Sequence, residues 1–198
     1  MSVQSAVETL RDSSREGAVP MSGLEAVVAG ALSVLPADAW WVPGLREHGG
    51  AVLREVPEER LADPHQGARP YKIAPVSAAP ALRALHAVGL ARASGGPALV
   101  HLGIGSVADG AFSEALNLAA LLSAPVIFLV AELPLTDAAP LGPQTAASAT
   151  ALAKAYDIPS FSADGSDPVS VARAVEEALG RGGPAVISAT LPTPGASS

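Results

Sequence analysis

The sequence predicts an α/β fold, a three-layer sandwich with a mostly parallel sheet. Continuous aliphatic segments at 98–102, 126–130 and 185–190 have the length and composition of strands that are buried on both faces. Segments with helical periodicity alternate with them, and breaks such as Gly95-Gly96-Pro97 separate the two kinds. This alternation is typical of a parallel sheet that is covered by helices on both sides.

Helices are expected wherever apolar residues recur at helical spacing between turn signals. Ser22 and Glu25 form a capping-box pattern at the start of the first helix, and Asp164–Pro168 forms a turn and N-cap before the last one. The expected helices lie at about 22–34, 57–61, 79–93 and 147–155, and two more are expected after Gly110 and after Pro168. Their predicted inward faces carry Leu82, Leu85, His86 and Gly89; Phe112, Leu116, Ala119 and Leu122; and Val171, Val175 and Leu179.

The domain organisation follows from these elements. Residues 1–19 are polar and weakly patterned, so we expect an N-terminal arm or a frayed helix there. Residues 20–192 are expected to form the single folded domain, and 193–198 a flexible tail. Trp40-Trp41-Val42 is expected to be a short extended or buried segment.

Composition excludes several classes of partner. The net charge is −7 and no cluster of Lys and Arg is interleaved with aromatics, so we expect no nucleic-acid partner. The longest apolar run, Ala124–Ala131, is too short to cross a bilayer, and we expect a cytoplasmic protein without a membrane partner. Cysteine is absent, which excludes disulfides and a thiol nucleophile.

One long motif connects the chain with a known family. Residues 103–120 read G-I-G-S-V-A-D-G-A-F-S-E-A-L-N-L-A-A. This stretch resembles the thiamine-binding segment of the α subunits of thiamine-diphosphate-dependent 2-oxo acid dehydrogenases (pyruvate, branched-chain or acetoin type), which runs G-D-G, then G-x-F, then E-A-L-N-x-A-A. Shorter resemblances follow the family's order from about Pro20 to Leu191: Gly23–Ala26, Leu45–Gly49, His86–Gly89, Ala124–Val130 and Ala163–Asp167.

The resemblance implies a thiamine-diphosphate-binding fold and a partner, either a β-like subunit or a second copy of the chain. In the family, an Asp of G-D-G and an Asn of an N-N pair hold Mg²⁺ through hard oxygen ligands. In the ungapped register these positions are Ile104 and Leu133, which are 133 − 104 = 29 residues apart and cannot coordinate a cation. Asp109 could replace the missing Asp only through a five-residue shift (109 − 104 = 5), which Phe112, Glu114 and Asn117 argue against.

Few side chains could still meet the family's cofactor, thiamine diphosphate with Mg²⁺. If it binds, the candidates are Arg46, Gly103, Gly105 and Glu132. Where the family has polar pocket residues before H-A-V-G, this chain reads Ala81-Leu82-Arg83. With its two ligand positions aliphatic, the chain is expected to have no metal ligand and no bound cofactor.

The histidines offer little catalytic chemistry. His48 is the candidate catalytic residue, although a structural hydrogen-bonding role fits it better. His86 is expected in the core, His101 in a buried strand and His65 in an exposed loop. Gly103, Gly105 and Gly110 do not have the spacing of a dinucleotide-binding loop.

Three functional interpretations remain open at this point. The first is a shortened, degenerate relative of the α subunit that acts as a structural or regulatory partner. The second is a working subunit that uses altered ligands such as Glu132 and Arg46 together with a β-like partner. The third is a pocket that serves another small ligand. If the scaffold is otherwise intact, Ile104→Asp together with Leu133→Asn should restore a cation site.

Overall fold

Five parallel strands form the central sheet of the computed structural model, which describes residues 2–12, 21, 23–57, 59, 63–133 and 145–192. The strand order is β1-β2-β3-β5-β4. The strands are β1 (Trp40–Val42), β2 (Ala98–Gly103), β3 (Val126–Glu132), β4 (Ser160–Asp164) and β5 (Ala185–Thr190). The three long buried segments and the short Trp40–Val42 segment are strands as expected, which confirms the α/β class with a parallel sheet.

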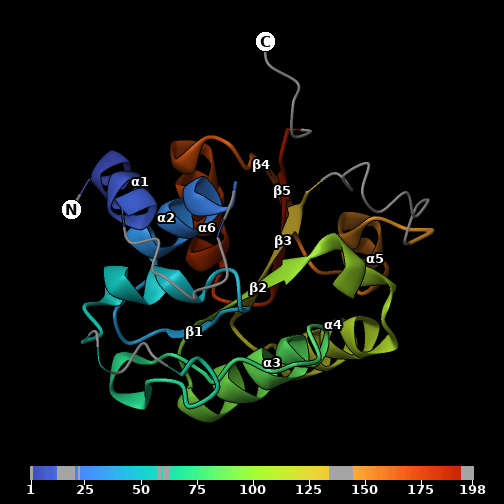
Figure 1. The fold of residues 1–198 in the computed structure, drawn as a ribbon. Coiled ribbons are helices and arrows are strands. Elements are labelled where there is room, and N and C mark those ends of the chain that lie inside the picture. The colour runs from blue at the N-terminus through green and yellow to red at the C-terminus, as the bar shows by residue number, and fades with distance from the viewer. Residues whose placement is uncertain are drawn as a thin grey trace.

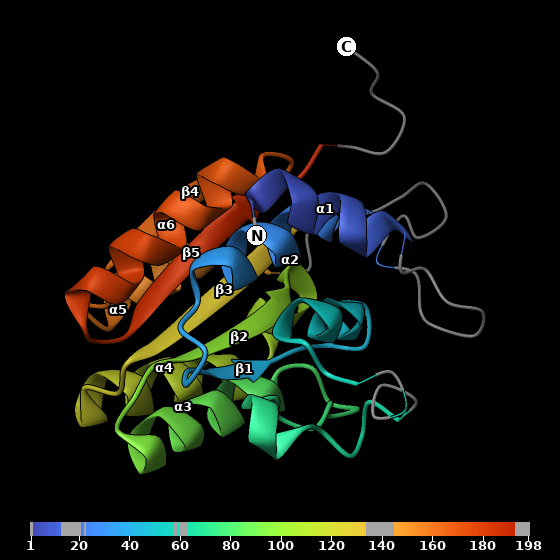
Figure 2. The same ribbon diagram turned by 90° about the vertical axis from the view of Figure 1, so that its left-hand side faces the viewer.

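Helices cover both faces of the sheet. Figures 1 and 2 show α1 (Val3–Asp12), α2 (Glu25–Val34) and α6 (Pro168–Arg181) on one side, and α3 (Leu82–Ser94) and α4 (Gly110–Leu122) on the other. Residues of α5 (Ala149–Ala155) belong to the same apolar cluster as those of α3 and α4. Three short 3₁₀ helices complete the elements used below: η1 (His48–Arg54), η3 (Arg69–Tyr71) and η4 (Ile104–Ala108). Among the described residues, no helix has the length and apolarity needed to cross a membrane.

Alternation along the strands divides the core into two apolar clusters. On β2, Leu99 belongs to the cluster under α2 and α6, whereas Val100 belongs to the cluster under α3 and α4. Successive strand side chains point to opposite faces, so each central strand contributes to both clusters. Phe112 of α4 meets Phe128 of β3 edge to face, with ring centroids 5.9 Å apart. Both helical layers are therefore fixed to the same sheet by large buried side chains.

The N-terminal region contains a packed helix. Within residues 1–19, α1 buries Ala6, Val7 and Leu10 against α2 and its neighbours. These three positions recur at helical spacing, so the polar residues between them face outward. The expectation of an arm or frayed helix was therefore wrong for residues 3–12. The expected tail at 193–198, most of the expected helix at 57–61 and the expected cap Ser22 lie outside the described residues.

The inward face of α3 differs from the expected one. Its buried residues are Arg83, Ala84, Ala87, Val88 and Ala91. The expected face was wrong: Leu82 is 43% exposed, and His86 and Gly89 are exposed as well. The reason is steric, because small alanine side chains let α3 approach β2 and α4 closely, and this rotates the larger residues outward. Leu122 of α4 was also expected inside and is 45% exposed.

Arg54 fixes the chain on either side of β1. Its guanidinium donates hydrogen bonds to the carbonyls of Pro36, Ala39 and Tyr71 at 2.8, 3.0 and 2.9 Å. Burial lowers the pKa of Arg54, and Asp38 partly opposes this effect. These hydrogen bonds satisfy backbone carbonyls in irregular segments. They also hold β1, whose carboxyl end opens onto the cavity described next.

Candidate functional site

A cavity of about 420 Å³ lies at the carboxyl ends of β1, β2 and β3 and is called the edge cavity below. Gly44, two residues after β1, lines it together with Gly103 at the end of β2 and Ala131 near the end of β3. Ligand sites of parallel α/β sheets lie characteristically outside the carboxyl ends of the strands. The edge cavity is therefore the candidate functional site.

The structure brings part of the predicted set together here. Arg46, Gly103, Gly105 and Leu133 all line the edge cavity. Ile104, Glu132 and His48 are not among its lining residues. Four of the residues named from the sequence therefore line one cavity, and three do not.

The two expected metal-ligand positions do not converge. Ile104 packs against the apolar cluster under α3 and α4, whereas Leu133 packs against the cluster under α2 and α6. Their side chains lie on opposite faces of the sheet, although β2 and β3 are neighbours. The expectation that oxygen ligands placed at both positions would meet on one cation does not agree with this geometry.

Glu132 is held by a neighbouring strand. Its Oε1 accepts a hydrogen bond from Ser188 Oγ at 2.7 Å, between β3 and β5. A carboxylate in a short charge-assisted bond of this kind is fixed in position. Its role in the structure is therefore to connect two strands beside the edge cavity.

Arg46 lies on the wall of the edge cavity. Its Nη2 donates to the carbonyl of Met21 at 3.0 Å, so the guanidinium also anchors the segment before α2. The side chain is half-buried. Arg46 therefore combines a structural contact with a place at the cavity.

Asp109 also lines the edge cavity, which the sequence interpretation did not expect. Its Oδ1 accepts from the backbone N–H of Ala111 at 2.9 Å, which makes Asp109 the N-cap of α4. An N-cap carboxylate is stabilised by the helix dipole and the unpaired amides of the first turn. Among the described residues, no group of three or more His, Cys, Asp or Glu side chains could hold a metal ion, so Asp109 belongs to no such cluster.

Sequence reasoning missed two buried charges in the edge cavity. Glu47 and Arg83 are 8% and 6% exposed, and both line it. Burial lowers the pKa of Arg83, while the attraction of Glu47 raises it. The signal that could have found Arg83 is its place on the otherwise alanine-rich inward face of α3.

His101 and Trp41 lie buried on neighbouring strands next to this charged centre. Their rings meet edge to face at 6.0 Å, and the His101 carbonyl accepts a hydrogen bond from Arg83 Nη2 at 3.2 Å. Burial, assisted by the positive charge of Arg83, lowers the pKa of His101 to about 3. The imidazole is therefore neutral at physiological pH and acts as a packing residue, in agreement with its expected place in a buried strand.

His48 begins η1 and is half-buried. Burial lowers the pKa of His48, Asp63 opposes this, and His65 adds to it. The lowered pKa keeps the imidazole neutral near pH 7.

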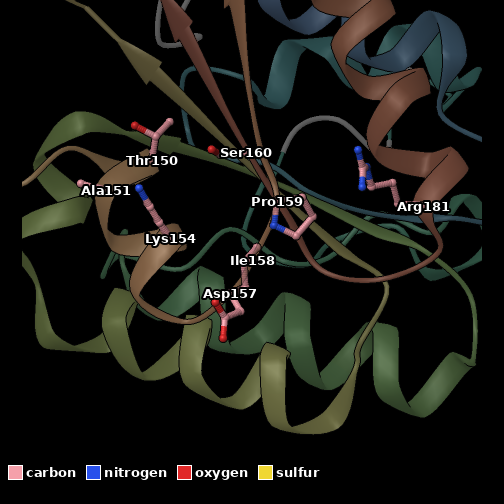
Figure 3. Close-up of a pocket in the computed structure, with 8 residues that line it drawn as sticks. All are labelled: Thr150, Ala151, Lys154, Asp157, Ile158, Pro159, Ser160 and Arg181. Carbon is pink, nitrogen blue, oxygen red and sulfur yellow. The ribbon is translucent and has the colours of Figure 1, made fainter.

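Two further cavities lie away from the carboxyl edge. The first, of about 620 Å³, lies at the start of β4, where Lys154 and Arg181 flank the Ile158–Ser160 segment from opposite sides (Figure 3). Its two cations do not converge on one point in this view. The second, of about 650 Å³, lies between α3 and the 66–77 segment and is lined by Trp40, Ile73 and His86. His86, expected in the core, is exposed at this cavity because α3 turns its alanines inward.

Solved structures share this fold. A thiamin diphosphate-dependent enzyme from Mycobacterium smegmatis superposes with a TM-score of 0.63 and 20% identity, covering 89% of this chain and 32% of its own. Transketolase from Campylobacter jejuni gives a TM-score of 0.70 with 16% identity, covering 96% of this chain and 37% of its own. The chain therefore has the thiamine-diphosphate-binding type of α/β fold, as its motifs predicted.

Sequence comparison specifies the family. Residues 80–188 match the family described as the dehydrogenase E1 component. The α subunit of 3-methyl-2-oxobutanoate dehydrogenase from Mycobacterium tuberculosis is 30% identical over 187 residues, which cover 86% of this chain and 51% of the relative. The α subunit of acetoin:2,6-dichlorophenolindophenol oxidoreductase from Bacillus subtilis is 38% identical over 90 residues, 43% of this chain and 27% of its own.

The chain belongs to the dehydrogenase E1 component family, and its relatives are α subunits of 2-oxo acid dehydrogenase type. This confirms the family suggested by the motif at 103–120. The chain spans about half the length of the first of these relatives.

Proposed function

We propose that this chain is a degenerate E1 α-subunit-like protein that works as a non-catalytic structural or regulatory partner. Its partner is a β-like subunit or a second copy of the chain. The proposal is supported by membership of an α-subunit family and by the finding that, within the described part of the chain, no group of three or more His, Cys, Asp or Glu side chains could hold a metal ion.

The donor set of the edge cavity does not fit thiamine diphosphate with Mg²⁺. Mg²⁺ needs several oxygen ligands in near-octahedral geometry. Ile104 is packed in an apolar cluster, Leu133 presents a hydrocarbon wall, and Glu132 is bonded to Ser188. An aliphatic wall beside a diphosphate would remove its hydration without replacing it. We therefore assign no chemical step to this cofactor here.

Arg46 favours the alternative, a working α-type subunit with altered ligands. It remains at the edge cavity, where a guanidinium could pair with a phosphate group. In that case a β-like partner would have to supply the remaining groups. A measurement of thiamine diphosphate binding therefore distinguishes the degenerate partner from the working subunit.

We predict that the isolated chain binds thiamine diphosphate with Mg²⁺ negligibly, because ligand positions on opposite faces of the sheet cannot share one cation. Isothermal titration calorimetry up to millimolar cofactor, with Mg²⁺ or with EDTA, should give no saturable Mg²⁺-dependent heat. The Ile104→Asp, Leu133→Asn double variant should behave in the same way. Saturable Mg²⁺-dependent binding of the wild type at micromolar cofactor would favour the working α-type subunit over the degenerate one.

We also predict that the chain associates through the outer side of α4. Leu121 and Leu122 are 73% and 45% exposed, and contiguous exposed leucines commonly mark a contact surface. Light scattering of the purified chain should give a mass above the 19.7 kDa monomer. Leu121→Glu with Leu122→Glu should dissociate the assembly, whereas Val169→Glu should leave it intact, since Val169 is 50% exposed on the opposite layer. If the wild-type chain is monomeric and captures no β-like chain, the outer side of α4 is not an association surface.

A further inference from the structure

The side of β4 that is turned away from β5 is called the free edge of β4 below. The strand order ends with β1 on one side of the sheet and with β4 on the other. The outer side of β1 is partly covered, because Ile73 forms a parallel bridge with Trp41. Among the described residues, no strand pairs with β4 on its outer side. Such an edge offers backbone donors and acceptors to another chain.

The hydrogen bonds between β4 and β5 show which backbone groups face the free edge. The carbonyl of Pro159 and the N–H of Gly165 both bond to the β5 side. Alternate residues of a strand bond to the same neighbour, so Ser160 and Ser162 direct their N–H and C=O groups to the free edge. The next outward group, the N–H of Asp164, is bonded to a serine hydroxyl of α6 at 3.0 Å. The groups available to another chain are therefore those of the two serines, which are both exposed.

Two cations flank the start of this edge, one from each helical layer. Lys154 of α5 and Arg181 at the end of α6 both line the cavity of about 620 Å³ at the start of β4. Figure 3 shows them on opposite sides of the Ile158–Ser160 segment. The guanidinium carbon of Arg181 lies 5.7 Å from the centroid of the Phe161 ring, which holds this cation beside β4. A cavity lined from both helical layers has to pass around the sheet, and Ser160 lies on its wall.

This arrangement of charges suits an added strand better than a compact anion. The two cations do not converge on one point, so one small anion cannot pair with both. Successive side chains of a strand point to opposite faces of the sheet. Two consecutive acidic residues of an added strand would therefore meet Lys154 on one face and Arg181 on the other. The charged lining residues are these two cations against Asp157, a formal balance of 2 − 1 = +1, which also favours an acidic segment.

We propose that the free edge of β4 binds an extended acidic segment of a partner protein by strand addition. The backbone of the segment forms hydrogen bonds with Ser160 and Ser162, and two consecutive acidic side chains pair with Lys154 and Arg181. The main-chain hydrogen bonds provide affinity, and the two cations select for negative charge. The inference goes beyond the proposed function and does not depend on it, because no residue of β4 lines the edge cavity.

The test uses the full chain and a fluorescein-labelled peptide, Thr-Val-Thr-Asp-Glu-Thr-Val-Thr. Fluorescence anisotropy at about 150 mM salt, which screens distant charges, should show saturable binding. The same peptide with Lys-Lys in place of Asp-Glu should not bind. A peptide that is N-methylated at its four central residues keeps its charge but lacks the backbone donors, so it should not bind either. The last comparison separates strand addition from ion pairing alone.

Charge reversal on the protein tests the two cations. Lys154→Glu with Arg181→Glu should weaken binding of the acidic peptide about tenfold, because two attractions become repulsions. Both side chains are exposed, so the variant should fold normally. Arg92→Glu with Arg173→Glu is the matched control, because it makes the same change in net charge at two exposed arginines outside this cavity. This control should bind the peptide like the wild type.

Ser162→Pro tests the backbone contact. Proline removes the N–H that faces the free edge and leaves the hydrogen bonds between β4 and β5 in place, a position at which edge strands tolerate proline. The variant should keep a melting temperature close to that of the wild type and lose binding of the acidic peptide. If it does not fold, the N-methylated peptide tests the same hydrogen bonds from the partner's side.

Three results would each overturn the inference: no saturable binding of the acidic peptide, equal binding of its N-methylated form, or equal binding by the Lys154→Glu, Arg181→Glu variant. If Ser162→Pro instead dissociates a self-associated wild type, a second copy occupies the free edge of β4 and the assignment to an acidic partner is wrong. The proposed function is tested separately by the titration with thiamine diphosphate and Mg²⁺, so failure of one is distinguishable from failure of the other.

Discussion

Replacing Gly30 by alanine should destabilise the fold by about 2–3 kcal/mol, because an added methyl group overpacks a rigid helix contact. A Cβ at Gly30 would lie 2.4 Å from the carbonyl oxygen of Pro168 and 2.9 Å from Val171 Cβ. These atoms belong to the first turn of α6, whose backbone cannot move aside as a flexible side chain could. Urea unfolding at pH 7.5 measures the change.

Gly89→Ala is the matched control. Gly89 also lies inside a helix, α3, but a Cβ there would meet nothing within 4 Å. Alanine lowers the entropy of the unfolded chain and favours the helix, so this variant should be more stable by about 0.5–1 kcal/mol. The same substitution is thus expected to change stability in opposite directions at the two positions. A Gly30→Ala protein as stable as Gly89→Ala would show that α2 and α6 do not pack as closely as described.

Acidification should destabilise the protein through His101. The pKa of His101 is lowered to about 3, whereas the unfolded chain has the ordinary value of 6.5. Between these two values the unfolded state binds a proton that the folded state does not, so stability falls as pH decreases through this window. At about 1.4 kcal/mol per pH unit below 6.5, the loss between pH 7.5 and pH 4.5 should approach roughly 2–3 kcal/mol.

His101→Leu should remove most of this dependence. Leucine fills the buried site with apolar volume and carries no titrating group, so its unfolding free energy should change little from pH 7.5 to pH 4.5. A small slope should remain, since burial also lowers the pKa of His48. His86→Gln is the control, because His86 is exposed, and it should keep the full wild-type slope. If His101→Leu and wild type lose the same stability, His101 is protonated in the folded state and its neighbourhood is less enclosed than described.

The edge cavity was only partly predictable. The motif at 103–120 placed Gly103 and Gly105 at the carboxyl end of a strand, and the structure finds them lining the edge cavity there. Arg83 and Glu47 were missed because their importance depends on burial. Nothing in the local sequence says that a charged residue of an alanine-rich helix will face inward. Ile104 and Leu133 could be placed at the ends of two strands. Which face of the sheet each side chain packs on depends on how the chain leaves the sheet after each strand.

The sequence by itself determined the parallel sheet, the family and the edge at which the cavity lies. Buried aliphatic strands such as Val126–Glu132 and turns such as Asp164–Pro168 are local patterns that short-range chemistry specifies. Only the tertiary structure decided which face of α3 is buried, that residues 3–12 pack on α2, and that Arg83 is buried beside Glu47 at the edge cavity. These features follow from close packing between segments that are distant in the sequence. Small residues such as Ala84 and Gly30 let their helices pack closely against neighbouring elements, and this contact cannot be predicted from hydrophobic periodicity and polarity alone.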